Sequence, residues 1–87
     1  MATYSVRIKT SAIKEIQAIP TKRERQRIVR RISALAEDPR PSGCQKLAGG
    51  SNRFRVRQGR YRIVYSVEDS ELVVEVVRVG HRKDVYR

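Results

Sequence analysis

Polar and apolar residues alternate near the start of the chain and then change to a helical spacing. Residues 4–9 read YSVRIK, and this period of two predicts a half-buried β-strand. A short helix is expected next, with Ser11 as its N-cap and Pro20 as the residue that ends it. Thr21 and Glu24 have the spacing of a capping box, so a second helix is expected to begin there.

The second helix is expected to extend to Asp38 and Pro39 and to be amphipathic. Its apolar stripe consists of Ile28, Val29, Ile32, Leu35 and Ala36. The opposite stripe carries Arg23, Arg27 and Arg30. An apolar stripe must be buried against another element, so both helices are expected to cover one face of a sheet.

The second half of the chain predicts a loop and three strands. Residues 39–52 are rich in Pro, Gly and Ser and predict the loop. The strands are expected at residues 53–57, 60–67 and 72–79, and the last is apolar on both faces, as a central strand is. The order is therefore β-α-α-β-β-β. It predicts an α+β fold in which a small antiparallel-rich sheet carries two antiparallel helices on one face, with residues 1–87 as a single domain.

An arginine-rich hairpin is expected between the second and third strands. A turn at residues 58–59 pairs Arg57 with Arg60 and Arg55 with Arg62, and this register places the apolar residues of both strands on one face. The four arginines then share the other face, although like charges opposite each other destabilise a sheet. Because the stretch contains no carboxylate, we expect a bound anion such as a phosphate to complete this face.

The chain is strongly basic, with 20 Lys and Arg against 9 Asp and Glu and a net charge of +11. Such a surface attracts polyanions, so nucleic acid or an acidic protein is the expected partner. With one His, one Cys and scattered carboxylates, neither a metal site nor a cofactor is expected. No apolar stretch is long enough for a membrane span, and the first residues lack the apolar region of a signal peptide. A cytoplasmic protein without membrane contact is therefore expected.

These residue types still allow cleavage of RNA without a metal, because the 2′-hydroxyl of RNA can attack the adjacent phosphate. The protein must then supply a proton acceptor, a proton donor and cations for the developing charge. Arginines provide the charge but essentially never deprotonate. His81 and Tyr86 are therefore the candidates for proton transfer, and either of them can move the proton.

Residues 46–87 resemble the C-terminal half of the RelE branch of the RelE/ParE toxin superfamily. The resemblance rests on KLAG at 46–49, FRVR at 54–57, YRIVY at 61–65 and VGHRKDVY at 79–86. It implies the toxin of a type II toxin–antitoxin system, an mRNA interferase that cleaves mRNA in the ribosomal A site through 2′-hydroxyl attack and so inhibits translation. The implied partners are 16S ribosomal RNA beside the mRNA, an acidic RelB-like antitoxin that neutralises the toxin, and operator DNA only as a toxin–antitoxin complex.

The resemblance also implies roles for individual residues. It assigns catalysis to Arg62, Arg82 and Tyr86, and contacts with RNA or phosphate to Arg55 and Arg57. Two further residues are expected to bind RNA or phosphate, Lys46 from the KLAG element and Arg60 from the arginine hairpin.

The chain departs from the family at three of these positions. Relatives often carry lysine where Arg55 and Arg57 stand, and some carry Lys or Arg at the position of His81. Lysine can share a proton whereas arginine essentially cannot, so Arg55 and Arg57 are expected to act through charge alone. We hypothesise that His81 takes over part of the acid–base work as a fourth catalytic residue.

Two other functions fit the same resemblance. A ParE-like toxin inhibits DNA gyrase without cleaving RNA, and an inactive member only binds its antitoxin or represses DNA. The fold does not distinguish among these functions. The arginine cluster together with His81 and Tyr86 favours the nuclease, because ParE-like proteins are expected to lack much of that set.

Overall fold

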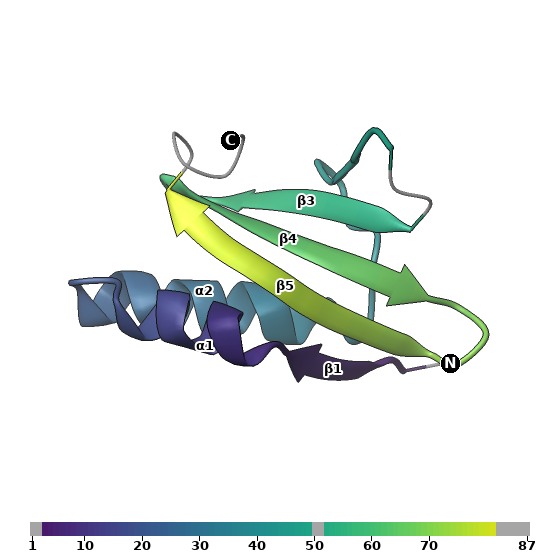
Figure 1. Ribbon diagram of the computed structural model, residues 1–87, viewed down its shortest axis with the longest axis horizontal. Coiled ribbons are helices and arrows are strands. Elements are labelled where there is room, and N and C mark those ends of the chain that lie inside the picture. Colours follow the sequence, from purple (N-terminus) through teal and green to yellow (C-terminus); the bar gives the residue numbers. More distant parts are fainter. Residues whose placement is uncertain (1–2, 50–51, 82–87) are drawn as a thin grey trace.

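The described residues, 3–49 and 52–81, form a five-stranded mixed sheet with two helices on one face in this computed structural model (Figure 1). The elements are β1 (Ser5–Ile8), α1 (Thr10–Gln17), α2 (Lys22–Ala34), β2 (Gln45–Lys46), β3 (Arg53–Gln58), β4 (Tyr61–Glu68) and β5 (Val73–His81). The sheet order is β1-β5-β4-β3-β2, in which β1 pairs with β5 in parallel and the other neighbours are antiparallel. The expected α+β class and the helices on one face are confirmed.

The strands differ from expectation in two places. The two-residue strand β2 lies inside the expected loop, where Gln45 and Lys46 pair with β3. The last strand begins at Val73 instead of Leu72, because Leu72 has a φ of 54° and belongs to the turn before β5. The strand β5 lies between β1 and β4, so its expected central position is confirmed.

The capping box that begins α2 is present. The Glu24 N–H donates to Thr21 Oγ1 at 3.4 Å, and the Thr21 hydroxyl donates to Glu24 Oε1 at 2.7 Å. Ser11, in contrast, is not the N-cap of α1. The Lys9 N–H donates to the Val76 carbonyl of β5 and the Lys9 carbonyl accepts from Ile13, so the chain passes from strand to helix without a side-chain cap.

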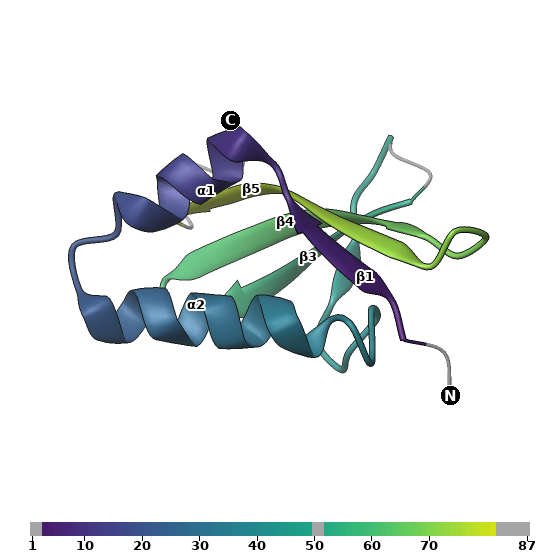
Figure 2. The ribbon, with the colours of Figure 1, turned by 90° about the horizontal axis from the view of Figure 1, so that it is seen from below.

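The core lies between the helices and the inner face of the sheet (Figure 2). Ile28, Ile32 and Leu35 of the predicted stripe are buried, whereas Val29 is 46% exposed. Val29 is turned about 100° from Ile28 around the helix axis, which takes it away from the sheet and towards the groove beside α1. The α-helix also ends at Ala34, before the expected stop, because the following residues change to i→i+3 hydrogen bonds.

A register shift in the β4–β5 pair determines which side chains of β5 reach each face. Val64 pairs with Arg78 but Tyr65 pairs with Val76, so Val77 is an extra residue on β5. A bulge of this kind reverses the facing of the residues after it. Val79 therefore enters the core beside Ile63, and Gly80 lies on the outer face.

No helix among the described residues is long and apolar enough to cross a membrane.

Candidate nucleic-acid interface

The β3–β4 hairpin places an arginine pair directly across the sheet. Arg57 lies opposite Arg62, and Arg55 lies opposite Val64. The expected pairs of Arg57 with Arg60 and of Arg55 with Arg62 are therefore wrong, because the turn consists of residues 59–60 instead of 58–59. Gly59 has a φ of 61°, the left-handed conformation that two-residue hairpin turns favour at their first position, and the residue before it stays in β3.

The change of register keeps the predicted faces for three of the four arginines. Alternate residues of β3 and β4 enter the core, so Arg55, Arg57 and Arg62 share the outer face. We call these three residues the outer arginine cluster. Arg60 leaves this face because it lies in the turn, where its Nε atom is 2.9 Å from Glu24 Oε2 of α2. The hydrogen bond from Thr21 and then the Arg60 guanidinium hold the pKa of Glu24 below its usual range.

The three side chains of the outer arginine cluster differ in exposure. Arg62 is 5% exposed and is the only charged residue buried in the described part of the chain. Arg57 is exposed, and Arg55 is half-buried and donates to Gln45 Oε1 of β2. A hollow of about 290 Å³ lies beside them, lined by Gly43, Gln45, Arg55 and Arg57. The arrangement provides fixed positive charge with room for an anion.

The positions of Lys46 and Arg53 relative to the outer arginine cluster differ from the prediction. Lys46 pairs with Phe54, so its strand position belongs to the helix-side face, whereas Gln45 shares the outer face with Arg55. Arg53 is also exposed on the outer face, opposite Ser66, although it was not among the predicted site residues. The signal was present in the sequence, because Arg53 continues the same alternation as Arg55.

His81 is the last residue of β5 and pairs with Tyr61. The two rings meet edge to face, with centroids 5.9 Å apart at an angle of 74°. This pair lies on the helix-side face, in phase with Ile63 and Val79, and borders a hollow of about 280 Å³ that Glu15 also lines. His81 is thus at the same end of the sheet as Arg62 but is displaced to its other face.

The remaining predicted site residues, Arg82 and Tyr86, lie outside the described residues. The structure therefore brings together Arg55, Arg57 and Arg62 but not Arg60 or Lys46. Within residues 3–49 and 52–81, no three His, Cys, Asp or Glu side chains gather closely enough to hold a metal ion. The geometry of the described residues is that of an anion site built from guanidinium groups.

This mixed sheet with two helices on one face matches the fold of toxins in solved bacterial and archaeal toxin–antitoxin complexes. The family model of the ParE toxin of the type II toxin–antitoxin system parDE matches residues 6–86, so the chain belongs to this family. Within the RelE/ParE superfamily it belongs to the RelE branch, as its sequence motifs predict.

Individual relatives support this placement. The chain is 29% identical over 84 residues to toxin RelG of Mycobacterium tuberculosis, covering 97% of each protein. Its fold matches the RelE–RelB complex of Pyrococcus horikoshii OT3 with a TM-score of 0.82 and 28% identity, covering 95% of this chain and 99% of that one. The RelBE2 toxin–antitoxin complex of M. tuberculosis matches with a TM-score of 0.79 and 28% identity, covering 92% and 99%.

Proposed function

We propose that this RelE-family toxin is an endoribonuclease that cleaves mRNA in the ribosomal A site. The observation that carries the proposal is the outer arginine cluster. The strand positions directly beside its members hold Gln45, Val64 and Gly80, none of which is a carboxylate. Like charges held together in this way cost stability, and a phosphate ligand offsets the cost.

The proposed reaction uses the RNA as its own nucleophile. The 2′-oxygen forms a bond to the adjacent phosphorus, the P–O5′ bond breaks, and the products are a 2′,3′-cyclic phosphate and a free 5′-hydroxyl. Negative charge grows on the phosphate oxygens as the transition state forms, and guanidinium groups already in place stabilise it. In this proposal Arg62 and Arg82 stabilise the reacting phosphate, and Arg55 and Arg57 hold the RNA backbone.

One proton must leave the 2′-hydroxyl and one must reach the 5′-oxygen. We assign this transfer to His81 and Tyr86, because arginine stays protonated at any physiological pH. His81 lies at the end of β5 on the helix-side face, so its part in this proposal requires the RNA to reach it around that end of the sheet. Two variants separate their roles. His81→Gln is expected to change the pH profile of cleavage, and Tyr86→Phe is expected to lower its rate. If His81→Gln leaves both rate and pH profile unchanged, proton transfer belongs to Tyr86 alone.

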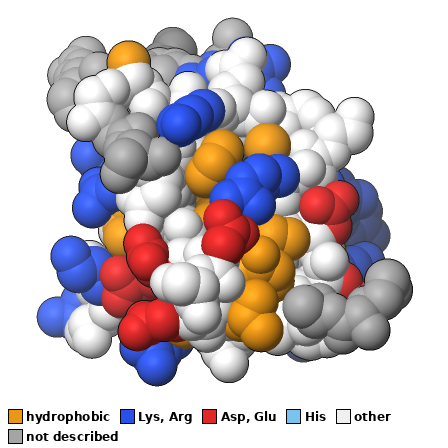
Figure 3. Space-filling view, turned by 90° about the vertical axis from the view of Figure 1, so that its right-hand side faces the viewer, with side chains coloured by type: hydrophobic (Ala, Val, Ile, Leu, Met, Phe, Trp, Pro, Cys, Tyr) orange, Lys and Arg blue, Asp and Glu red, His pale blue; other side chains and the backbone are white. Residues whose placement is uncertain are grey.

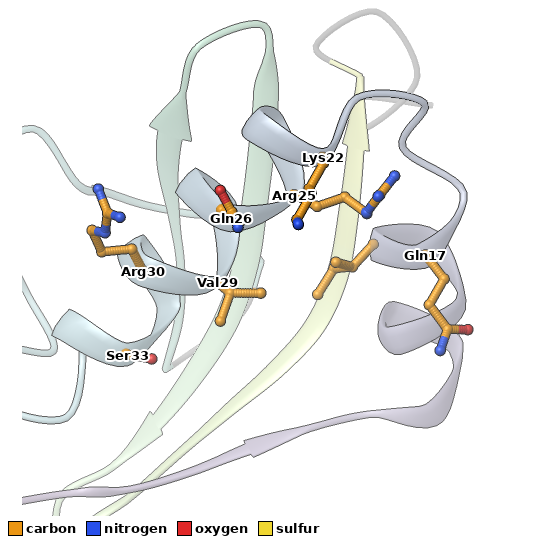
Figure 4. A pocket seen from close by; sticks show the side chains of 8 residues that line it. Gln17, Lys22, Arg25, Gln26, Val29, Arg30 and Ser33 are labelled. Atoms are coloured by element: carbon orange, nitrogen blue, oxygen red, sulfur yellow. The ribbon is translucent and has the colours of Figure 1, made fainter.

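The antitoxin is the second proposed partner. The RelE proteins of P. horikoshii and M. tuberculosis form complexes with their antitoxins, and a net charge of +11 favours an acidic partner. A groove of about 730 Å³ beside α1 and α2 supports this proposal (Figure 4). Its apolar floor includes Ile16 and Val29, and basic side chains surround it at Lys22, Arg25 and Arg30. These features fit an amphipathic acidic helix of a RelB-like antitoxin, and only that complex is proposed to bind operator DNA.

The match to a ParE family model favours one alternative, a toxin that poisons DNA gyrase. The chemistry separates the two functions. Ribosomes programmed with a synthetic mRNA are mixed with purified toxin, and a matched mRNA carries 2′-deoxyribose only at the cut position. The nuclease cleaves the first message and not the second. If both messages stay intact while the toxin traps gyrase on DNA, the alternative is correct.

A further inference from the structure

A second group of arginines lies on the helix side of the molecule, separate from the outer arginine cluster. Arg27, Arg30 and Arg31 of α2 border a hollow of about 370 Å³ together with Ala34 and Gln58. We call it the α2 hollow. Among residues 3–49 and 52–81, its lining contains three guanidinium groups and no carboxylate. Figure 2 shows α2 running beside β3 and β4, so the hollow opens where this helix meets the hairpin.

The carboxylate nearest along α2 already has partners. Glu24 lies one turn before Arg27, and its two oxygens contact Arg60 Nε and the Thr21 hydroxyl. Arg27 and Arg30 are both exposed, and Arg31 is half-buried with an Nε atom that has no hydrogen-bond partner among the described residues. The described lining of the α2 hollow thus combines three guanidinium groups. The nearby Glu24 carboxylate is already bound to Thr21 and Arg60, and the charge of Arg27 also helps to lower its pKa.

The two basic groups meet at the tip of the β3–β4 hairpin. Gln58 lines the α2 hollow, and its neighbour Arg57 belongs to the outer arginine cluster. Gly59 makes the turn tight, so only two residues separate the paired strands at the tip. A polyanionic chain that crosses the outer face therefore meets positive charge again directly after passing the tip.

The opposite end of the molecule has a different charge distribution. At the β4–β5 turn, Asp69 binds the Arg40 guanidinium at 2.7 Å and accepts a hydrogen bond from Tyr4 at 2.6 Å. Glu68 accepts from Asn52 at 2.6 Å. Figure 3, which faces this end, shows acidic and basic side chains next to one another. The described surface around the hairpin tip therefore has a larger excess of basic side chains than the β4–β5 end.

We propose that the α2 hollow binds a backbone phosphate of RNA, and that the RNA strand passes from the outer arginine cluster around the hairpin tip to α2. This inference rests on the proposed nuclease function and extends its substrate contact to a second subsite. Arginine suits the role because its planar fork binds two phosphate oxygens at once. An acidic protein is the less favoured occupant here, because the hollow shares Arg30 with the neighbouring groove but lacks the apolar floor that Ile16 and Val29 give that groove.

Binding of a non-cleavable RNA tests the proposal. The probe is a fluorescent 2′-O-methyl oligonucleotide of about 12 nucleotides, and a second probe of about 4 nucleotides is too short to pass the tip. Arg27→Gln combined with Arg30→Gln is compared with Arg23→Gln, an exposed arginine of the same helix outside the hollow. Fluorescence anisotropy is measured between about 50 and about 200 mM NaCl, a range over which phosphate contacts change affinity strongly.

The double variant is expected to bind the long probe about tenfold more weakly, as loss of charge-assisted hydrogen bonds implies. Its salt slope should fall by about 0.7 for each phosphate that the variant no longer binds. The double variant should bind the short probe as tightly as the wild type does. Arg23→Gln should change the salt slope for the long probe much less than the double variant does.

Three other results overturn the inference. If the double variant loses no more than twice the binding free energy that Arg23→Gln loses on the long probe, only net charge matters and there is no subsite. If Arg27→Gln alone, which leaves the Arg30 side of the apolar groove unchanged, weakens the complex with an acidic RelB-like antitoxin while the double variant binds the long probe normally, the hollow belongs to a protein partner. If neither probe binds the wild-type toxin, or Arg55→Gln with Arg57→Gln has no effect, the proposed RNA contact of the outer face fails as well. If Arg27→Gln with Arg30→Gln weakens binding of the long probe only, the proposed RNA contact of the outer face still stands.

Discussion

Removing one charge from the arginine pair of the hairpin should make the protein more stable and less active. Arg57 and Arg62 are directly opposed on the outer face. Two unit charges about 6 Å apart repel by about 0.7 kcal/mol in bulk water and about 3 kcal/mol at an effective dielectric constant of 20. Arg57 is exposed and can turn its guanidinium group into solvent, away from the buried Arg62, so we take the net repulsion from the range of about 0.2–1 kcal/mol for cross-strand pairs. Arg57→Gln should therefore raise the free energy of unfolding by about 0.5 kcal/mol.

For a chain of 87 residues, this gain corresponds to a melting temperature about 2–4 °C higher. Thermal unfolding is measured at low and at high salt, since added salt screens the repulsion and should remove the gain. Arg53→Gln is the matched control, because Arg53 lies exposed on the same face of β3 but opposite Ser66. Cleavage by the Arg57→Gln toxin should fall by at least about tenfold, as removal of a charge-assisted hydrogen bond to phosphate implies. A less stable Arg57→Gln protein, or equal stabilisation by Arg53→Gln, would refute the reasoning.

Three predictions concern the frame that holds the interface. Thr21→Ala removes the α2 cap and should cost about 1 kcal/mol of unfolding free energy in urea, whereas Ser33→Ala in the exposed last turn should cost little. Tyr65→Phe removes the hydrogen bond of 2.7 Å to the Pro39 carbonyl in the core and should cost about 1 kcal/mol, measured in the same way; an unchanged midpoint would mean that the bond contributes nothing. The hydrogen bond from Arg40 holds the pKa of Asp69 below its usual range. The carboxylate therefore stabilises the fold at pH values above its unfolded pKa of about 4. This contribution is lost as the pH falls through the folded pKa. Asp69→Asn should therefore make thermal stability less dependent on pH in the acid range, and an unchanged acid dependence would show that Asp69 plays no part.

The alternation of apolar and polar residues was sufficient to predict the order of the main elements and the faces of the hairpin. Burial in a sheet depends on a period of two, and a register error of two residues leaves that period intact. This is why Arg55, Arg57 and Arg62 were placed correctly although the pairing was wrong. The glycine conformation of the turn decides the pairing itself, and Arg60 could not be placed without it.

Contacts between distant parts of the chain explain the other differences. The ion pair of Arg60 with Glu24 joins residues 36 positions apart, and no local pattern contains it. The bulge at Val77 is equally hidden, because residues 72–79 are apolar on both faces and carry no alternation that could show a break. The α2 hollow arises where helix and hairpin meet, so its arginines were visible in the sequence as one stripe of a helix but not as part of a cavity.

The central claim is that the outer arginine cluster makes this toxin a nuclease of translated mRNA. The most direct measurement is primer extension on a reporter message after induction of the toxin in cells, with a matched message whose start codon is removed. Wild-type toxin should produce cuts within the translated message and none in the untranslated one. Arg55→Gln with Arg57→Gln should reduce these cuts by about a hundredfold, the order expected when fixed donors to a reacting phosphate are removed. The account would be contradicted if the wild-type toxin stops cell growth while the message stays intact. It would also be contradicted if the double variant cuts the message as much as the wild type does.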